Sequence, residues 1–237
     1  MKGYKVEGHL HVKGNSGCAR TSVEDIVKIY KGYGYSGIIV TNHFNKLIYE
    51  NYFKGSDEEK INEFFKTYNQ LKENKEGLKI YFGVEFALGE DHYGLPLKKK
   101  CAELLVYGIT PDEFKDHAIS IINNGYEDLK ALAESKGWLV FQAHPFRERT
   151  KLISLSLVDG IESYNGNPRH LNNNGKAKRY MEKNGLLEVA GSDFHLKGDV
   201  SSAMVFAELP NDEKELVSAL KKHILGILKG RKARKRI

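Results

Sequence analysis

The stretch GHLHV, residues 8–12, ends the first predicted β-strand and indicates how the rest of the chain is organised. His9 and His11 are two residues apart, so on an extended strand both imidazoles project to the same face, about 7 Å apart along the chain. One metal ion can therefore bind both side chains. We interpret this strand end as the first part of a metal site.

Short runs of strand-forming residues recur along the chain between helical stretches. The predicted strands are Tyr4–His11, Ile38–Asn42, Ile80–Phe86, Leu104–Ile109, Leu139–His144, Gly160–Tyr164, Leu187–Ser192 and Ala203–Ala207. This alternation predicts an α/β fold in which βα units surround a mainly parallel sheet. In barrels of this kind the active site lies at the C-terminal ends of the strands.

The stretches between these strands have the period of amphipathic helices. The run from Val23 to Tyr30 has apolar residues at i, i+3, i+4 and i+7, and Thr21 with Glu24 offers a capping box ahead of it. A last helix is predicted from the apolar stripe of Leu216, Ala219, Leu220, Ile224, Ile227 and Leu228.

The composition is that of an ordinary globular protein. The chain has 237 residues, of which 41% are hydrophobic and 29% charged, enough for one core and typical of one α/β barrel. No segment approaches the roughly 20 consecutive apolar residues that span a bilayer, and the start MKGYKVEGHLHV lacks the apolar core of a signal peptide. Two cysteines, Cys18 and Cys101, are too few for a disulfide framework. We therefore expect a cytoplasmic protein that does not bind membranes.

The net charge of +6 is concentrated at the C-terminus. The last nine residues, Lys229–Ile237, contain six of the 37 basic residues and no acid, so 31 basic residues face 31 acidic ones elsewhere. We therefore expect a single domain over residues 1–228 and a basic tail over residues 229–237. Such a tail can contact nucleic acid, or it can be a solvated terminus.

Histidine and carboxylate side chains gather at or beside the predicted strands. The histidines at strand ends are His9, His11, His43, His144 and His195, and the carboxylates are Glu85, Glu103, Glu162 and Asp193. Asp193 and His195 repeat the i, i+2 spacing of the first strand. A carboxylate is costly to bury unless it is paired or bound to metal. Imidazole and carboxylate ligands without thiolate favour Zn, Mn or Fe in a catalytic site.

Six motifs, GHLHV, VTNHF, GVEF, QAHPFR, GIESYNGNPRH and GSDFH, occur in this order between Tyr4 and His195. Together they resemble the polymerase-and-histidinol-phosphatase (PHP) family of metal-dependent phosphoesterases. The resemblance implies a distorted seven-stranded (β/α)7 barrel with two or three divalent ions, Zn, Mn or Fe, at the strand C-termini. It implies one ion held by His9, His11, Glu85 and Asp193, a second held by Glu85 and His144, and a third held by His43 and His195.

Three positions depart from the family pattern. Glu103 stands before LLVYGI, where the family often has His; as an oxygen ligand it favours a harder metal. Asn42 places an amide where the TDH-like segment of the family has a carboxylate that orients the neighbouring histidine. After HLH the family usually has Asp or His five or six residues on, and here the chain has Ser16, Gly17 and then Cys18.

Further site residues are expected around these ligands. Arg20, Arg147 and Arg169 lie close in sequence to the proposed ligands or in a loop after a strand, and guanidinium groups match phosphate oxygens; surface salt bridges are the alternative. Asp193 and His195 are the expected catalytic residues.

Residues outside this set are expected to have structural roles. Glu162 is expected to pair with an Arg or Lys, and His92, His117 and His223 to be structural or exposed.

The predicted reaction is hydrolysis of a phosphomonoester or small phosphodiester by a metal-bound hydroxide, with a phosphorylated small molecule as substrate. Two alternatives stay open. One is exonucleolytic hydrolysis of DNA or RNA, which the basic tail favours and the neutral body opposes. The other is a metal-stabilised interaction module that has lost catalysis, against which the retained ligand motifs argue.

Overall fold

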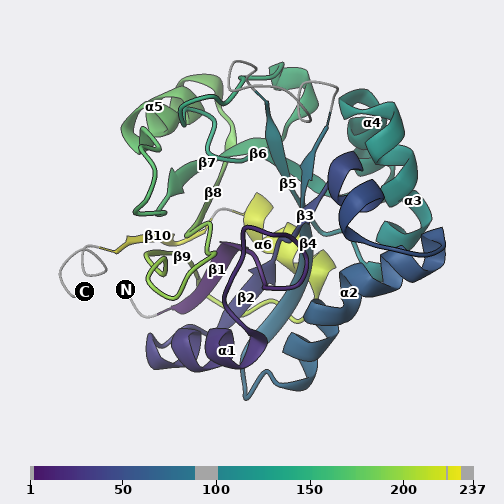
Figure 1. Cartoon of the computed structure of the whole chain (residues 1–237). Coiled ribbons are helices and arrows are strands. Elements are labelled where there is room, and N and C mark those ends of the chain that lie inside the picture. The colour runs from purple at the N-terminus through teal and green to yellow at the C-terminus, as the bar shows by residue number, and fades with distance from the viewer. Residues whose placement is uncertain (1–2, 89–100, 223, 231–237) are drawn as a thin grey trace.

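The computed structural model describes residues 3–88, 101–222 and 224–230, which form one mixed sheet surrounded by helices (Figure 1). The strands are β1 (Tyr4–Leu10), β2 (Gly37–Val40), β3 (His43–Phe44), β4 (Lys79–Ala87), β5 (Glu103–Tyr107), β6 (Leu139–Gln142), β7 (Gly160–Asn165), β8 (Leu187–Gly191), β9 (Ser202–Phe206) and β10 (Gly226–Lys229). Their order is β10-β9-β1-β2-β4-β5-β6-β7-β8, and β3 pairs with β4.

The direction of the strands changes around the sheet. The pairs β1–β2, β2–β4, β6–β7 and β7–β8 are parallel, whereas β5 runs antiparallel to both β4 and β6. β9 is antiparallel to β1 and β10 is antiparallel to β9. The sheet is therefore mixed, and the expected parallel arrangement holds for only part of it.

The sheet is a nearly closed barrel because the end of β8 returns to β1. Leu10 forms an isolated parallel bridge with Phe194, whose backbone N donates to His9 O and whose carbonyl accepts from His11 N. Gly191 permits this approach, since a Cβ there would lie 2.3 Å from the Cβ of His9. The predicted barrel class is confirmed. The predicted count of seven strands is too low for the described chain, because β3, β9 and β10 also belong to the sheet.

Helices surround the barrel (Figure 1). They are α1 (Val23–Gly32), α2 (Asp57–Glu73), α3 (Pro111–Asn124), α4 (Tyr126–Lys136), α5 (Asn174–Asn184) and α6 (Glu213–Lys221), with short turns at Ile48–Tyr52 and Leu155–Leu157. α2 and α3 begin with capping boxes at Ser56 and Thr110. The cap of α1 is Ser22, which accepts from Asp25 N, so the capping box expected at Thr21 is wrong by one residue.

Two apolar clusters hold the layers together. The larger cluster packs helices α1, α2, α3 and α4 against the sheet, and it includes buried Leu10, Phe64 and Phe114. The smaller one joins strand residues such as Tyr107 and Phe141 to the buried face of α6. Leu216 of α6 is fully buried in it. The apolar faces predicted from the helical period are therefore the faces that pack.

The C-terminal helix is shorter than its apolar stripe predicts. α6 ends at Lys221, and Ile227 and Leu228 lie on β10, where they pair with Met204 and Ala203 of β9. Spacing of three or four residues fits a helix, but these residues gain backbone hydrogen bonds by extending the sheet. The prediction of a single helix to Leu228 is therefore wrong. Lys229, expected to open the basic tail, is the last residue of β10, and residues 231–237 of that tail lie outside the described part of the chain.

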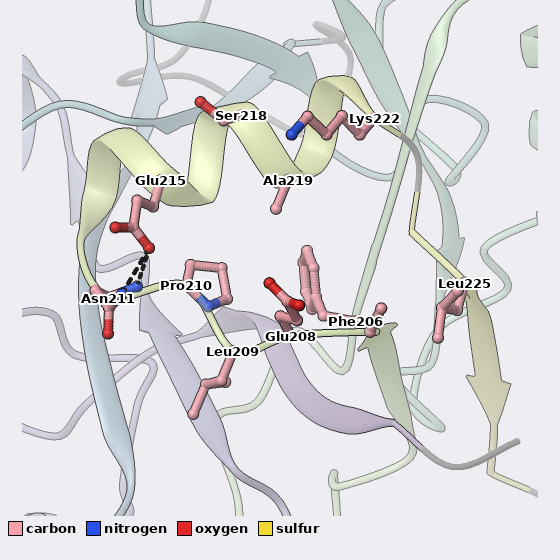
Figure 2. A pocket seen from close by; sticks show the side chains of 11 residues that line it. Phe206, Glu208, Leu209, Pro210, Asn211, Glu215, Ser218, Ala219, Lys222 and Leu225 are labelled. Atoms are coloured by element: carbon pink, nitrogen blue, oxygen red, sulfur yellow. Dashed lines mark hydrogen bonds between the residues drawn. The ribbon is translucent and has the colours of Figure 1, made fainter.

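A cavity of about 390 Å³ lies between α6 and the segment that follows β9 (Figure 2). It is lined by Phe206, Pro210 and Ala219 among others, and on one side Asn211 donates two hydrogen bonds to Glu215 Oε2 at 2.9 Å. None of the predicted metal ligands lines it. Within the described residues, no helix has the length and apolar character to span a membrane.

Candidate metal centre

The structure brings the predicted metal ligands together at one end of the barrel. They come from β1 and the residue after it (His9, His11), β3 (His43), β4 (Glu85), β5 (Glu103), the residue pair after β6 (His144) and the segment after β8 (Asp193, His195). Apart from His43 and Glu103, these residues lie at or just after the C-terminal ends of their strands. His43 is the first residue of β3, whose parallel pairing with β4 places it beside Glu85. Glu103 is the first residue of the antiparallel β5 and pairs with Ala87, so the reversed strand places it at the same end.

Glu85 lies at the centre of this cluster and is fully buried. Its Oε1 is 3.2 Å from His9 Nε2 and 3.5 Å from His144 Nε2. Its Oε2 is 2.7 Å from His43 Nδ1 and 3.4 Å from His11 Nε2. Each carboxylate oxygen therefore faces two imidazoles, which is the arrangement expected of a carboxylate shared between two cation positions.

Asp193 provides the second shared carboxylate. Its Oδ1 is 3.6 Å from His9 Nε2, 3.4 Å from His11 Nε2 and 3.3 Å from His195 Nδ1. Its Oδ2 accepts a hydrogen bond of 2.6 Å from Arg147 Nη2. Oδ1 thus points into the cluster, and Oδ2 is held by Arg147.

Several buried polar atoms of the cluster have no hydrogen-bond partner. They are His9 Nε2, His11 Nδ1 and Nε2, His144 Nδ1 and both carboxylate oxygens of Glu85. A buried polar group without a partner costs roughly 1–3 kcal/mol, and more when it is charged, so a set of them concentrated in one place requires compensation. Divalent cations supply it, because the donor set is imidazole nitrogen and carboxylate oxygen.

Potential ligand atoms approach one another in three overlapping groups, each within 4.8 Å: His9, His11 and Asp193; His11, His43 and His195; and His43, Glu85 and Glu103. The overlap means that neighbouring cation positions share side chains. The donor types and their spacing therefore fit the binding of divalent metal.

The electrostatics of the cluster also indicate a cation site. Burial by itself lowers the pKa of His9, but Glu85, Glu162 and Asp193 raise it well above its usual value. His11 differs: burial, together with His43 and His195, lowers its pKa well below the usual value. The carboxylates around His9 thus favour positive charge at this place, and a divalent ion would supply it.

Glu162 orients His9, a role that the sequence did not predict. Its Oε1 is 3.1 Å from His9 Nδ1, and its Oε2 accepts from His144 N at 2.8 Å and from Asn165 Nδ2 at 2.9 Å. An ionised carboxylate only accepts hydrogen bonds, so it places the proton of His9 on Nδ1 and leaves Nε2 free to bind metal. The expected pairing of Glu162 with Arg or Lys is therefore wrong. The available signal was a carboxylate within the buried strand GIESY.

Glu7 is a second buried carboxylate that sequence reasoning missed. Its Oε1 accepts from the backbone N of His9 at 2.9 Å and of Ser192 at 2.7 Å, and its Oε2 accepts from Tyr30 Oη at 2.9 Å. Burial raises the pKa of Glu7 to about 7, although the hydrogen bonds from Ser192 and His9 oppose the shift. Glu7 thus ties together the two backbone segments that carry His9 and Asp193.

Backbone strain is present at two of the candidate ligands. His144 has φ 25° and Asp193 has φ 50°, values that non-glycine residues rarely adopt. The surrounding contacts hold them there: Glu162 accepts from His144 N, and Asn167 Nδ2 donates to Asp193 O at 2.9 Å. Strain of this kind concentrates at functional sites.

The three predicted phosphate-binding arginines have different surroundings. Arg147 lies at the cluster. Its Nη2 donates to Asp193 and Asn165, and its Nε donates to Asn172, so part of its guanidinium is already bonded to Asp193. The Arg20 side chain is exposed, and its backbone N donates to His195 O at 3.1 Å.

Arg169 forms a two-pronged ion pair with buried Asp199, at 3.2 and 2.8 Å. Asp199 Oδ2 also accepts from the backbone N of His195 and of Leu196. In this structure Arg169 therefore supports the loop that carries His195 and does not point a free guanidinium into the cluster.

Two of the three altered family positions, Asn42 and Glu103, have defined contacts in the structure. Asn42 Oδ1 accepts from Val12 N at 2.8 Å and Asn42 Nδ2 donates to Thr67 Oγ1 at 3.2 Å, so the amide fixes the segment after His11. An ionised carboxylate has no hydrogen to donate to Thr67. Glu103 Oε2 lies 3.3 Å from His144 Nε2, inside the cluster.

Cys18 lies beside the cluster. Burial raises the pKa of its thiol, but hydrogen bonds with His195 and His43 oppose this and lower the pKa to about 5. Of the remaining histidines, His117 lies on α3 with its ring centroid 6.2 Å from that of Trp138, away from the cluster. His92 and His223 lie outside the described residues, as does the run Lys98–Lys100.

Comparison with known proteins places the chain among related sequences and folds. A family model described as the PHP domain matches residues 7–233. A search of the curated proteins found no match. Three crystal structures are similar in fold at 13–15% sequence identity.

One is a predicted metal-dependent phosphoesterase from Bifidobacterium adolescentis (15% identity, TM-score 0.51, 93% of this chain and 96% of that chain). Another is a two-domain protein from Bacteroides vulgatus containing a predicted PHP-like metal-dependent phosphoesterase (14%, TM-score 0.55, 93% and 62%). The third is an amidohydrolase from Chromobacterium violaceum with bound sulfate and no metal (13%, TM-score 0.53, 94% and 97%). At identities this low, the similarity shows a shared fold and no more.

Proposed function

The chain belongs to the PHP-domain family, and on that premise we propose that it is a metal-dependent phosphoesterase. Family membership and the ligand cluster support a metal-dependent hydrolase. The further step to phosphomonoesters or small phosphodiesters as substrates is our proposal. One observation carries the metal dependence: buried imidazole and carboxylate atoms without hydrogen-bond partners are concentrated where His9, His11 and Glu85 meet.

The proposed ligands divide into overlapping sets around the shared carboxylates. His9, His11, Glu85 and Asp193 would hold one ion, and Glu85, Glu103 and His144 a second. His43 and His195 would contribute to a third. Divalent ions bound there would lower the pKa of coordinated water and neutralise phosphoryl charge.

The protein side chains around the ions have separable tasks in this proposal. Arg147 holds Asp193 through Oδ2, which fixes the direction of the other oxygen, and its guanidinium is placed to attract a phosphate. In a centre whose third position is vacant, His195, whose side chain is 11% exposed, would hold a proton at the mouth of the cluster and pass it to the leaving oxygen. Asp193 orients the His195 ring by accepting at its backbone carbonyl, 3.0 Å from Nδ1.

The first experiment measures metal content and substrate range together. Purified protein is subjected to elemental analysis and assayed with Mn, Zn or Mg added separately, on phosphomonoesters, cyclic and linear phosphodiesters and short oligonucleotides. We expect bound metal and hydrolysis of at least one small phosphoester, and loss of activity with a strong chelator. Metal-free protein with full activity would contradict the mechanism.

The same assay discriminates the alternatives. Preference for oligonucleotides would indicate the exonuclease, and stoichiometric metal with no hydrolysis of any substrate would indicate an interaction module. His9→Ala and Asp193→Ala should lose both metal and rate while circular dichroism stays unchanged. His117→Ala, a histidine on α3 outside the cluster, is the matched control and should retain both.

Glu103 offers a test of metal preference within the same proposal. A carboxylate oxygen is a harder donor than imidazole, so it should favour Mn or Fe over Zn. Glu103→His should therefore shift metal selectivity toward Zn while activity is retained. Unchanged stoichiometry and selectivity would show that Glu103 does not bind metal, despite its position 3.3 Å from His144.

A further inference from the structure

A series of buried hydrogen bonds runs from the end of β1 to helix α2. Val12 N donates to Asn42 Oδ1 at 2.8 Å, Asn42 Nδ2 donates to Thr67 Oγ1 at 3.2 Å, and Thr67 Oγ1 donates to Asn15 Oδ1. Asn15 Nδ2 then donates to the carbonyl of Phe64 at 2.7 Å. The three side chains in this series are at most 6% exposed, so solvent is not available to replace a lost partner.

The direction of the series is fixed at both ends. A backbone N–H only donates, so Asn42 must turn its oxygen toward Val12 and its NH₂ group toward Thr67. A backbone carbonyl only accepts, so Asn15 must turn its NH₂ group toward Phe64 and its oxygen toward Thr67. The Thr67 hydroxyl therefore has one arrangement, in which it accepts from Asn42 and donates to Asn15. A residue without a hydroxyl at position 67 would interrupt the series.

The near end of the series holds backbone that carries three candidate ligands. Val12 follows His11, and Asn42 precedes His43. The carbonyl of Asn42 also accepts from Glu85 N at 3.2 Å. If the Asn42 side chain turned over, its NH₂ group would meet Val12 N, and two donors would then face each other. The orientation of this one amide is therefore linked to the backbone of all three ligands.

The far end of the series is anchored away from the cluster. Thr67 lies on the buried face of α2, and the loop that carries Asn15 packs on it at Gly14. Gly14 has φ 110°, and a Cβ there would lie 3.3 Å from Thr67 Cγ2. Within the described residues, neither Thr67 nor Asn15 forms a hydrogen bond with a candidate ligand. An effect of either residue on bound metal must therefore pass through Asn42.

We propose that Thr67 and Asn15 are positioning residues of the metal centre and act through the Asn42 amide. This inference rests on the proposed function, because it concerns how the same ligands are held. The Thr67 hydroxyl keeps Asn42 Oδ1 directed at Val12 N and thereby fixes the backbone beside the ligands before metal binds. Loss of a partner behind a ligand costs about 10- to 100-fold in metal affinity. Thr67 lies further out than such a partner, so we expect about the lower figure.

The test compares two variants that separate the hydroxyl of Thr67 from its shape. Thr67→Val keeps the shape and removes the hydroxyl, whereas Thr67→Ser keeps the hydroxyl. We expect Thr67→Val to bind cobalt(II) about tenfold more weakly than the wild type, measured by competition with a chelator. In the metal-free protein, the Val12 amide of Thr67→Val should exchange with solvent faster relative to the amides of β2, measured by NMR. Thr67→Ser should restore both properties.

Ile61→Val, on the same buried face of α2, is the matched control. It removes one methyl group from the core and interrupts no hydrogen bond, so it should be less stable than the wild type. Its cobalt affinity and its relative exchange at Val12 should not change. Asn15→Ala removes the acceptor of the Thr67 hydroxyl and should behave like Thr67→Val. It therefore provides the same test if valine at position 67 prevents folding.

The outcomes separate this inference from the proposed function. Cobalt affinity equal to that of the wild type in Thr67→Val would refute the positioning role, whatever the activity. Equal losses in Thr67→Val and Thr67→Ser would also refute it, because packing would then be the cause. A loss that Thr67→Ser restores, in a protein that hydrolyses no phosphoester, would uphold the positioning role and refute the proposed function. A wild type that binds no cobalt would refute both.

Discussion

At the scale of single residues, the centre depends on side chains that hold other side chains. His9 has one nitrogen on Glu162 and the other beside Glu85 and Asp193, and its backbone N is bonded to Glu7. The sequence identified His9 from its spacing to His11. It did not identify Glu162, because nothing local links two residues that are 153 positions apart.

A substitution at Glu162 tests its orienting role. In Glu162→Gln, the amide oxygen must face the two donors His144 N and Asn165 Nδ2, so the NH₂ group faces His9 Nδ1. His9 would then carry its proton on Nε2, the nitrogen proposed to bind metal. We expect metal affinity to fall about 10- to 100-fold, the usual cost of losing such a partner, measured by chelator competition.

The control for this substitution is Glu188→Gln on the neighbouring strand β8. Glu188 accepts from Ser163 Oγ at 2.5 Å and lies 3.9 Å from Lys178 Nζ, and within the described residues it forms no hydrogen bond or ion pair with a candidate ligand. Its metal affinity should match that of the wild type. Equal affinity in both variants would mean that Glu162 does not select the His9 tautomer.

At the scale of elements, Glu113 joins three parts of the fold. Its carboxylate caps α3 by accepting from Thr110 N at 2.9 Å, accepts from Trp138 Nε1 at 3.0 Å and pairs with Lys214 of α6 at 3.0 Å. Burial by itself would raise its pKa, but Thr110, Lys214 and Trp138 lower the pKa below its ordinary value of 4.5.

This shift predicts how stability depends on pH. A carboxylate whose pKa is lower in the folded state stabilises the fold above its unfolded pKa and loses that contribution as pH falls through the folded value. Glu113→Gln keeps the shape and removes the charge, so it should be less stable by about 1 kcal/mol at pH 7. The difference should shrink as pH falls below 4.5, as measured by urea unfolding at several pH values.

Glu127→Gln in the exposed first turn of α4 is the comparison for this measurement. It removes an acidic residue from a helix N-terminus without removing a contact to another element, so its effect at pH 7 should be smaller. A difference between wild type and Glu113→Gln that is constant with pH would exclude the charge of Glu113 as the cause.

At the scale of the whole molecule, the site exists because the barrel closes. β8 meets β1 where Gly191 packs on the backbone of His9, and a Cβ at Gly191 would lie 2.5 Å from His9 N. Gly191→Ala must therefore push the two strands apart. We expect a loss of about 1–3 kcal/mol or more of unfolding free energy together with weaker metal binding, measured by denaturant titration and elemental analysis.

The matched control is Gly32→Ala at the end of α1, where an added Cβ meets no atom within 4 Å. That variant should be as stable as the wild type or slightly more so, because Ala favours helix more than Gly does. Stability of Gly191→Ala equal to that of the control would mean that barrel closure tolerates the extra carbon.

The basic tail gives a prediction about the substrate. Ending the chain at Gly230 preserves β10 and removes the basic residues beyond it. Turnover of a small phosphoester should not change. If nucleic acid is the substrate, the truncation should weaken binding and flatten its dependence on salt, because fewer counterions are released. An unchanged salt slope would exclude the tail from nucleic-acid binding.

The sequence by itself determined most of the strands, and it determined the type of donor gathered at their ends. Local periodicity places His9, His11, Glu85, His144, Asp193 and His195 at strand ends, and the parallel strands of an α/β fold bring those ends to one side. Most of the candidate ligand cluster could therefore be predicted from the sequence alone. The apolar spacing of three to four residues predicted a helix at Ile227 and Leu228, but these two residues lie on strand β10.

Only the tertiary structure decided which side chain meets which. The reversed direction of β5 places Glu103 beside His144, and closure of the barrel brings Glu162 to His9. The tertiary structure also pairs Arg169 with Asp199. The physical reason is that these contacts depend on strand order, direction and register, which result from packing of the whole chain, whereas spacing within one segment determines only which face a residue occupies.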